Sequence, residues 1–126
     1  MNKILFLTAL ALTACTPTVQ GFSSVGRSIN PSDSGQATLT LTDVEGFKTV
    51  AFAAGKQAAD QVVLTLTGLN LAVNDPTCFS NASAQLVCAV GGLPEGRTYV
   101  LPARGVLMVE AEYRRQDGKT YTLATD

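Results

Sequence analysis

The chain of 126 residues contains no histidine and no tryptophan, and charged side chains make up 15% of it. Without histidine there is no Ser-His-Asp or Cys-His relay for nucleophilic catalysis. Zinc and copper sites are excluded for the same reason unless free cysteines supply the ligands. The composition therefore predicts a protein that is not an enzyme and that holds neither a cofactor nor a metal.

Long apolar runs are also missing. A membrane-spanning helix needs about 20 apolar residues, and the run Ile4–Leu12 falls well short of that length. A single cation, Lys3, precedes this run, and small residues follow it. This order is typical of a secretory signal peptide, so we expect residues 1–14 to direct export and to be removed.

The signal ends with Leu12-Thr13-Ala14-Cys15. This segment resembles the lipobox of bacterial lipoproteins, in which an aliphatic residue and two small residues precede an obligatory cysteine. The resemblance implies cleavage before Cys15, a diacylglycerol on the Cys15 thiol, and an acylated new N-terminus. It implies a membrane-anchored protein, in the outer membrane if the host has one, because Thr16 is not the aspartate that favours inner-membrane retention. The alternative is an ordinary signal peptide that contains a cysteine.

Positive charge is not in excess either. Without Lys3, eight basic and ten acidic side chains remain. Binding to nucleic acid usually needs a basic stripe, so we expect no nucleic-acid partner.

Residues 15–36 are rich in Ser, Gly, Pro and Thr, a composition typical of a flexible tether. Alternatively, Phe22, Val25 and Ile29 form an irregular first strand. After this segment apolar and polar residues alternate, which indicates half-buried strands. The sequence therefore predicts one folded domain over residues 37–126.

Within that domain no segment has a sustained helical period. Val62, Leu64 and Leu66 share one face of a strand, and Gly68 marks a bulge or bend. About seven short strands with turn signals about every 8–12 residues predict an all-β fold, an antiparallel β-sandwich of Ig-like type. The expected strands are 37–42, 47–54, 61–73, 84–90, 98–101, 105–115 and 119–125.

The last two strands form the clearest hairpin, because Asp117-Gly118 between strand-like arms predicts a type I′ turn. The inward residues expected on its first arm are Leu107, Val109, Ala111 and Tyr113.

Two clusters of charged residues on this hairpin contain side chains that could act in catalysis or in ligand binding. Glu110 and Glu112 lie on one face of a strand, and paired carboxylates perform acid–base catalysis in glycosidases. Arg114, Arg115 and Lys119 form a basic cluster that would suit a phosphate or an acidic partner. We interpret both groups as solvent-exposed surface.

The remaining cysteines are Cys78 and Cys88, with nine residues between them. An even pair in an exported protein is normally a disulfide, because the compartment is oxidising. The alternative is a metal or redox pair, which would need Cys-x-x-Cys spacing or histidine. The stretch is also similar to Ig-like repeats of bacterial surface proteins, at Cys78, Cys88, Gly91, Leu93 and Gly96. That resemblance implies a sandwich in which the two cysteines link neighbouring segments.

Two functions fit these features. The first is a lipid-anchored, non-catalytic subunit that binds another envelope protein through an open sheet edge or an apolar face. The second is a binder of a small molecule or glycan on the loops. Sugar binding favours aromatic residues in loops, and the three tyrosines lie in expected strands, so the sequence favours the first function.

Replacing Cys15 with serine tests the lipid anchor, because serine has no thiol to accept the diacylglycerol. We expect the Cys15→Ser protein to stay unprocessed or to move to the soluble fraction, measured by intact mass and membrane fractionation. A variant that fractionates with membranes at the same processed mass would contradict the assignment.

Overall fold

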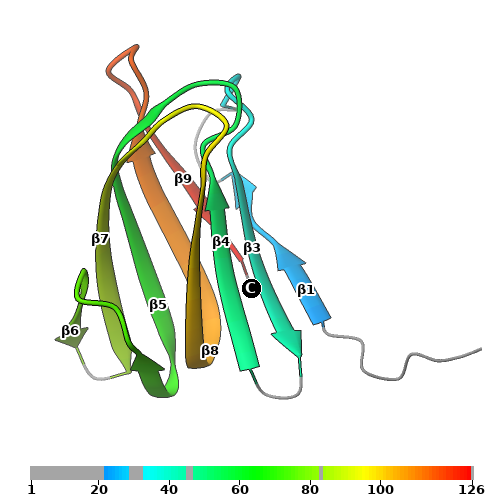
Figure 1. Ribbon diagram of the computed structural model, residues 1–126, viewed down its shortest axis with the longest axis vertical. Helices are drawn as coiled ribbons and strands as arrows, with labels where there is room; N and C mark the ends of the chain where they lie inside the picture. The colour runs from blue at the N-terminus through cyan, green and yellow to red at the C-terminus, as the bar shows by residue number, and fades with distance from the viewer. Residues whose placement is uncertain (1–21, 29–32, 45–46, 83, 126) are drawn as a thin grey trace, which may run out of the picture.

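The computed structural model describes residues 22–28, 33–44, 47–82 and 84–125. The expected signal peptide and Cys15 lie outside the described residues. The described elements are antiparallel β-strands, which confirms the predicted all-β sandwich (Figure 1). They are β1 Phe22–Val25, β2 Arg27–Ser28, β3 Thr38–Val44, β4 Phe47–Ala53, β5 Ala59–Val73, β6 Cys78–Ala82, β7 Gln85–Leu93, β8 Thr98–Arg114 and β9 Thr120–Ala124.

Strand β8 belongs to both layers of the sandwich. In the first sheet, β1, β3 and β4 are followed by the first half of β8, which pairs with β4 from Thr98 to Ala103. In the second sheet, the other half of β8 lies between β9 and β5, and β7 and β6 continue beyond β5. The short strand β2 pairs with the outer side of β9.

Strands β5 and β8 bend together at two glycines. A Cβ atom on Gly68 would lie 1.8 Å from the carbonyl oxygen of Gly105, and Gly105 has φ +77°. The β5–β8 register shifts on both sides of Gly68. The predicted bulge or bend at Gly68 is confirmed, and the expected strands 98–101 and 105–115 are one continuous strand.

The core lies between the two sheets and follows the alternation in the sequence. Val62, Leu64 and Leu66 are fully buried, as predicted. The rings of Phe52 from the first sheet and Tyr113 from the second meet with centroids 5.2 Å apart. Other large side chains that are fully buried are Leu39, Val50, Leu101, Val106 and Val109.

Leu107 departs from the inward face expected for its strand, although the other three residues of that face are buried. Leu107 is 57% exposed, and Val106 is buried instead. The ladder pairs Gly68 with Val106 and Thr67 with Met108, so Leu107 is the extra residue of a bulge. The bulge shifts the alternation of inward and outward side chains by one residue. A strict period of two in the sequence cannot predict such a shift.

Two strands lie inside residues 15–36, the expected tether. Strand β1 pairs with β3, and β2 pairs with β9. The alternative prediction, an early strand, is therefore correct for Phe22 and Val25. Ile29 lies outside the described residues. The described fold begins at Phe22 rather than at Ala37, because strands of four and two residues are too short to give a clear period.

The final hairpin turns through three residues rather than by the predicted type I′ turn. Gly118 has φ +82°, whereas Asp117 does not have a positive φ. The Gly118 N–H donates to the Arg115 carbonyl at 2.9 Å, and the Arg115 N–H donates to the Lys119 carbonyl at 3.1 Å. This is a type I turn followed by a glycine bulge. The Asp117 carboxylate stabilises it by accepting the Lys119 N–H at 2.8 Å.

Arg115 is buried, so its assignment to an exposed basic cluster is wrong. Its side chain is 1% exposed and forms an ion pair with Asp33, which is 6% exposed. The guanidinium Nε donates to Asp33 at 3.0 Å. The two terminal nitrogens donate to Asp33 and to the carbonyls of Gln57, Ala58 and Ala54. Its charge and its hydrogen-bonding capacity are therefore satisfied inside the protein.

The Asp33 carboxylate is the acceptor at the centre of this network. It accepts the Tyr113 hydroxyl at 2.7 Å and the N–H groups of Gly35 and Ala37. Burial raises the pKa of Asp33, but the hydrogen bonds from Arg115, Tyr113 and the two amides outweigh it and lower the pKa to about 2. Burial, together with the bond to Asp33, raises the pKa of Tyr113. The network fastens the segment before β3 to the end of β8.

This network should make folding sensitive to acid. The folded-state pKa of Asp33, about 2, lies below its ordinary value of 3.8. The ionised carboxylate therefore contributes about 2 kcal/mol to the free energy of unfolding. This contribution is complete at a pH above the ordinary pKa of 3.8 and is lost as the pH falls toward the folded-state pKa of about 2. We expect Asp33→Asn to lower the free energy of unfolding by about 3 kcal/mol near neutral pH, because Arg115 is left buried and unpaired. Urea unfolding at several pH values measures both effects.

The exposed Asp60 supplies the matched control, and Asp60→Asn should keep the wild-type acid dependence. An Asp33→Asn protein with an unchanged acid dependence would contradict this assignment.

Candidate functional site

Most of the charged residues considered from the sequence lie on the surface. Glu110 and Glu112 are exposed on the outer face of the second sheet, and Arg114 and Lys119 are exposed near the hairpin loop. Within the described residues there is no group of three or more His, Cys, Asp or Glu placed to hold a metal ion. The described part of the chain also contains no helix with the length and apolarity to span a bilayer.

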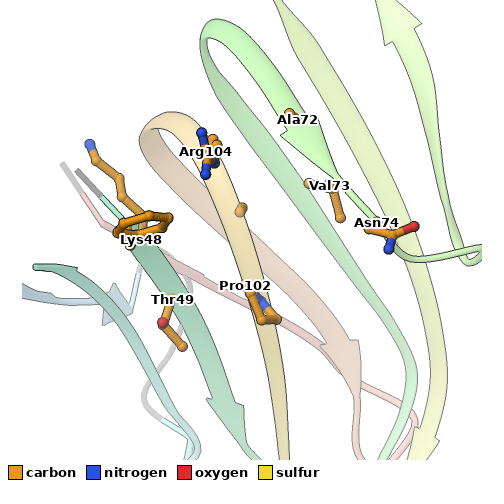
Figure 2. Close-up of a pocket in the computed structure, with 9 residues that line it drawn as sticks. Lys48, Thr49, Ala72, Val73, Asn74, Pro102 and Arg104 are labelled. Carbon is orange, nitrogen blue, oxygen red and sulfur yellow. The ribbon is translucent and has the colours of Figure 1, made fainter. Parts of the chain in front are cut away.

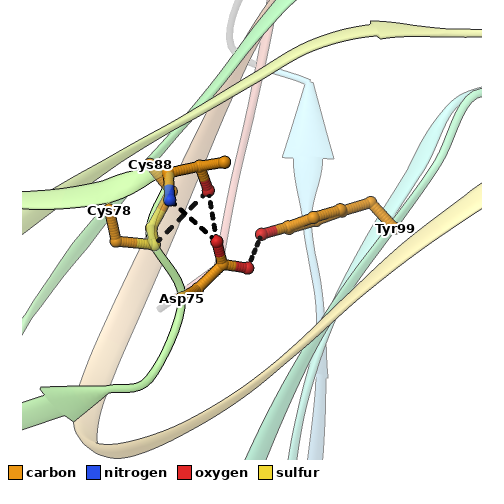
Figure 3. Close-up of a disulfide and its surroundings, with 5 residues drawn as sticks. Asp75, Cys78, Cys88 and Tyr99 are labelled. Atoms are coloured by element: carbon orange, nitrogen blue, oxygen red, sulfur yellow. Dashed lines mark hydrogen bonds between the residues drawn. A yellow bond between two sulfur atoms is a disulfide. The ribbon is translucent and has the colours of Figure 1, made fainter.

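Cys78 and Cys88 face each other on neighbouring strands of the second sheet. They are register partners in the β6–β7 ladder, and a disulfide joins them (Figure 3). This is the pairing expected from the sequence. Cys88 is fully buried in the core, and Cys78 is partly buried beside it. The disulfide therefore fixes the edge strand β6 to the body of the sandwich.

The disulfide also braces the loop that precedes it. In this loop Asp75 accepts the N–H of Thr77 at 2.9 Å and its hydroxyl at 2.7 Å. The other carboxylate oxygen accepts the hydroxyl of Tyr99 at 2.6 Å (Figure 3). The hydrogen bond from Tyr99 lowers the pKa of Asp75. Because Tyr99 lies in the first half of β8, this bond links the edge of the first sheet to the disulfide-braced part of the second.

The first half of β8 has a strand neighbour on one side. Strand β4 pairs with it through residues Thr98 to Ala103. On the other side the β5 ladder ends at the pair Val73–Ala103, and no other described strand continues it along Thr98–Pro102. Proline has no N–H to donate to a neighbouring strand. Pro102 thus lies where the β5–β8 pairing stops.

Pro102 also shows which way the neighbouring backbone groups point. It lies opposite Thr49, and a pair that exchanges two N–H···O bonds cannot include proline. Pair types alternate along an antiparallel ladder, so the pair Ala51–Val100 is of the same type as Thr49–Pro102. The N–H and C=O groups of Val100 therefore point away from β4, toward the open side. Val100 itself is 54% exposed. We call Thr98–Pro102 the β8 edge.

A groove lies beside the β8 edge, where β5 ends and the chain continues at Asn74. Its volume is about 360 Å³. Figure 2 shows Thr49, Pro102 and Asn74 on the three segments that border it. The residues that line it are Phe47, Lys48, Thr49, Ala72, Val73, Asn74, Pro102, Ala103 and Arg104.

The two cations of the groove differ in what they offer a ligand. The Arg104 guanidinium lies 4.9 Å from the centroid of the Phe47 ring, a cation–π contact that fixes both side chains. The Lys48 ammonium donates to the Val106 carbonyl and lies 3.7 Å from the Asp43 carboxylate. The charge of Lys48 is therefore already balanced, and Arg104 is the exposed cation of the lining.

Together the β8 edge and the groove can bind an extended peptide. An added strand gains main-chain hydrogen bonds from the edge, and a groove beside the edge selects a side chain. Sequence reasoning missed this site, because it ended the expected strand 98–101 just before Pro102. The signal was a proline inside an alternating pattern, which usually marks an edge or a bulge.

Removing the disulfide should measurably weaken the fold. We expect the Cys78→Ser/Cys88→Ser protein to lose about 3 kcal/mol in free energy of unfolding, the chain-entropy value for a loop of this length. Chemical unfolding measures the loss, with Tyr99→Phe as a milder control that removes one hydrogen bond. Two thiols that alkylate freely in native, non-reduced protein would contradict the bond.

Comparison with known proteins yields no match to this chain, whether to a protein-family model, a curated protein or a solved structure.

Proposed function

We propose that this protein is an exported, lipid-anchored and non-catalytic subunit of a cell-envelope assembly, and that its partner adds a strand to the β8 edge. The observation that carries the proposal is the one-sided pairing of Thr98–Pro102, with β4 on one side and the β5 ladder ending at Val73. Unpaired backbone groups of this kind are a template for a strand from another chain.

The chemistry of the β8 edge supports strand addition. Proteins usually protect exposed edges with charged side chains, very short strands or covering loops. The residues of this edge are Thr98, Tyr99, Val100, Leu101 and Pro102, and none is charged. The hydrogen bond between Tyr99 and Asp75 fixes the β8 edge to the loop before β6. The edge is therefore ordered before a partner binds. An ordered edge lowers the entropic cost of binding.

The proposed anchor explains how a short edge can suffice for binding. Lipid on Cys15 would confine the domain to a membrane surface, and two or more acyl chains make such an anchor lasting. Confinement raises the effective concentration toward neighbouring envelope proteins. The disulfide suits an oxidising compartment outside the cytoplasm. We therefore infer that the partner is another envelope protein.

A second candidate function is the binding of a small molecule or glycan, and the groove is the observation that favours it. Its volume of about 360 Å³ is within the usual range for ligand pockets. Its wall offers the exposed guanidinium of Arg104, the Thr49 hydroxyl and the Asn74 amide. Strand addition remains the better supported function, because it uses the edge and the groove together.

The variant Val100→Pro tests strand addition. It removes an N–H group that points to the open side and that β4 does not use, so the fold should persist while the partner is lost. We expect native electrophoresis of gently extracted membranes to place the wild-type protein in a complex and Val100→Pro in a smaller species.

Val100→Thr is the matched control, because it changes the side chain and keeps the N–H group. It should remain in the complex. A Val100→Pro protein that stays in a complex of unchanged size would rule out the edge, and a wild-type protein that always migrates as a monomer would rule out the assembly.

A further inference from the structure

Four large apolar side chains are exposed at the end of the sandwich where β5 and β8 bend. They are Phe47, Leu69, Leu107 and Met108, with 61%, 68%, 57% and 43% of their surface exposed. We call them the bend surface. In Figure 1 the bends of β5 and β8 and the start of β4 lie together at the lower end of the molecule.

The backbone holds three of these side chains outward. Thr67 pairs with Met108 and Gly68 pairs with Val106, which leaves Leu107 in the bulge. Leu69 follows Gly68 directly, and its carbonyl lies against Gly105. The tight contact of the two glycines therefore holds Leu69, Leu107 and Met108 at the same bend. Large apolar patches exposed to water usually mark a contact surface.

The fourth side chain, Phe47, joins this surface through Arg104. Arg104 packs over the Phe47 ring and lies one residue before the bend at Gly105. An acidic neighbour at this end, Asp43, is paired with Lys48. The bend surface thus combines apolar side chains with an exposed cation.

The chain enters the fold at this same end. Phe22, the first residue of β1, is the register partner of Asp43, which pairs with Lys48 next to Phe47. Phe22 lies seven positions after Cys15, a span of at most about 25 Å when the chain is fully extended. The second half of β8 runs from the bend to Arg114, about 30 Å at the usual rise per residue of a strand. A lipid surface at Cys15 is therefore within reach of the bend surface, and the hairpin loop lies at the other end.

We propose that the bend surface rests on the lipid bilayer, with its apolar side chains below the headgroups and Arg104 at the level of the phosphates. Apolar side chains flanked by cations are how proteins bind membrane interfaces. The inference rests on the lipid anchor of the proposed function and deepens it. Docked in this way, the strands stand on the membrane, and the β8 edge faces sideways toward neighbouring proteins.

The absence of tryptophan from the chain allows a direct test. In the full lipidated protein, Leu107→Trp places a single fluorophore on the bend surface, and Gln116→Trp places one in the exposed hairpin loop as the matched control. Each protein is reconstituted into vesicles of phosphatidylethanolamine and phosphatidylglycerol, with and without brominated acyl chains. We expect blue-shifted emission and loss of intensity with bromine for Leu107→Trp, and neither effect for Gln116→Trp.

Intact mass of the same samples separates this inference from the proposed anchor. If Cys15 is acylated and Leu107→Trp is quenched no more than Gln116→Trp, the docking is overturned and the anchor stands. If Cys15 carries no lipid and Leu107→Trp is still quenched, the docking is supported and the anchor fails. Circular dichroism checks the fold, and Met108→Trp replaces Leu107→Trp if that variant does not fold. A partner protein on the bend surface would leave both probes unquenched in these vesicles, which also overturns the docking.

Discussion

The close approach of Gly68 and Gly105 is the constraint on which the rest of this structure depends. No Cβ atom fits between the two backbones, so the two longest strands cross from one sheet to the other in the same place. Because of this crossing, β8 is an edge strand of the first sheet and a central strand of the second. It also determines where the sandwich exposes side chains that a straight strand would have buried, including Leu107 in the bulge.

The opposite end of the molecule is closed by charge rather than by backbone contact. Asp33 and Arg115 are paired inside the protein, and carbonyls from the segment Ala54–Ala58 accept the remaining guanidinium protons. Compared with apolar residues of similar volume, a buried ion pair adds little net stability, because desolvation offsets much of the attraction. Its effect here is positional, since a guanidinium with five directed donors fits one arrangement of the surrounding loops. One end of the sandwich is thus determined by a close backbone contact between two glycines, and the other by a buried ion pair with directed hydrogen bonds.

The sequence predicts the features that are local in the chain. Alternation identified the inward face at Val62, Leu64 and Leu66, and the glycine in that pattern identified the bend. It could not predict the Asp33–Arg115 pair, because the partners are 82 residues apart and neither stands out locally. Pro102 signalled an edge or a bulge in the sequence, but strand order decides which side of a strand is open, and strand order is not local in the chain. The cysteine pairing was predictable because Cys78 and Cys88 were the pair left once Cys15 was expected to carry the lipid.

The shared strand β8 has a consequence for how the protein folds. The two sheets share no strand until residues 98–114 are in place, and seven of the other strands precede them in the chain. The early strands pair with one another, with β8 or, in the case of β2, with β9, and most of the contacts that hold the layers together span long distances in sequence. Such a topology folds slowly and as one cooperative unit. The N-terminal segments therefore remain without a stable fold of their own while β8 is not available, a state in which a chain can still be threaded through a narrow channel.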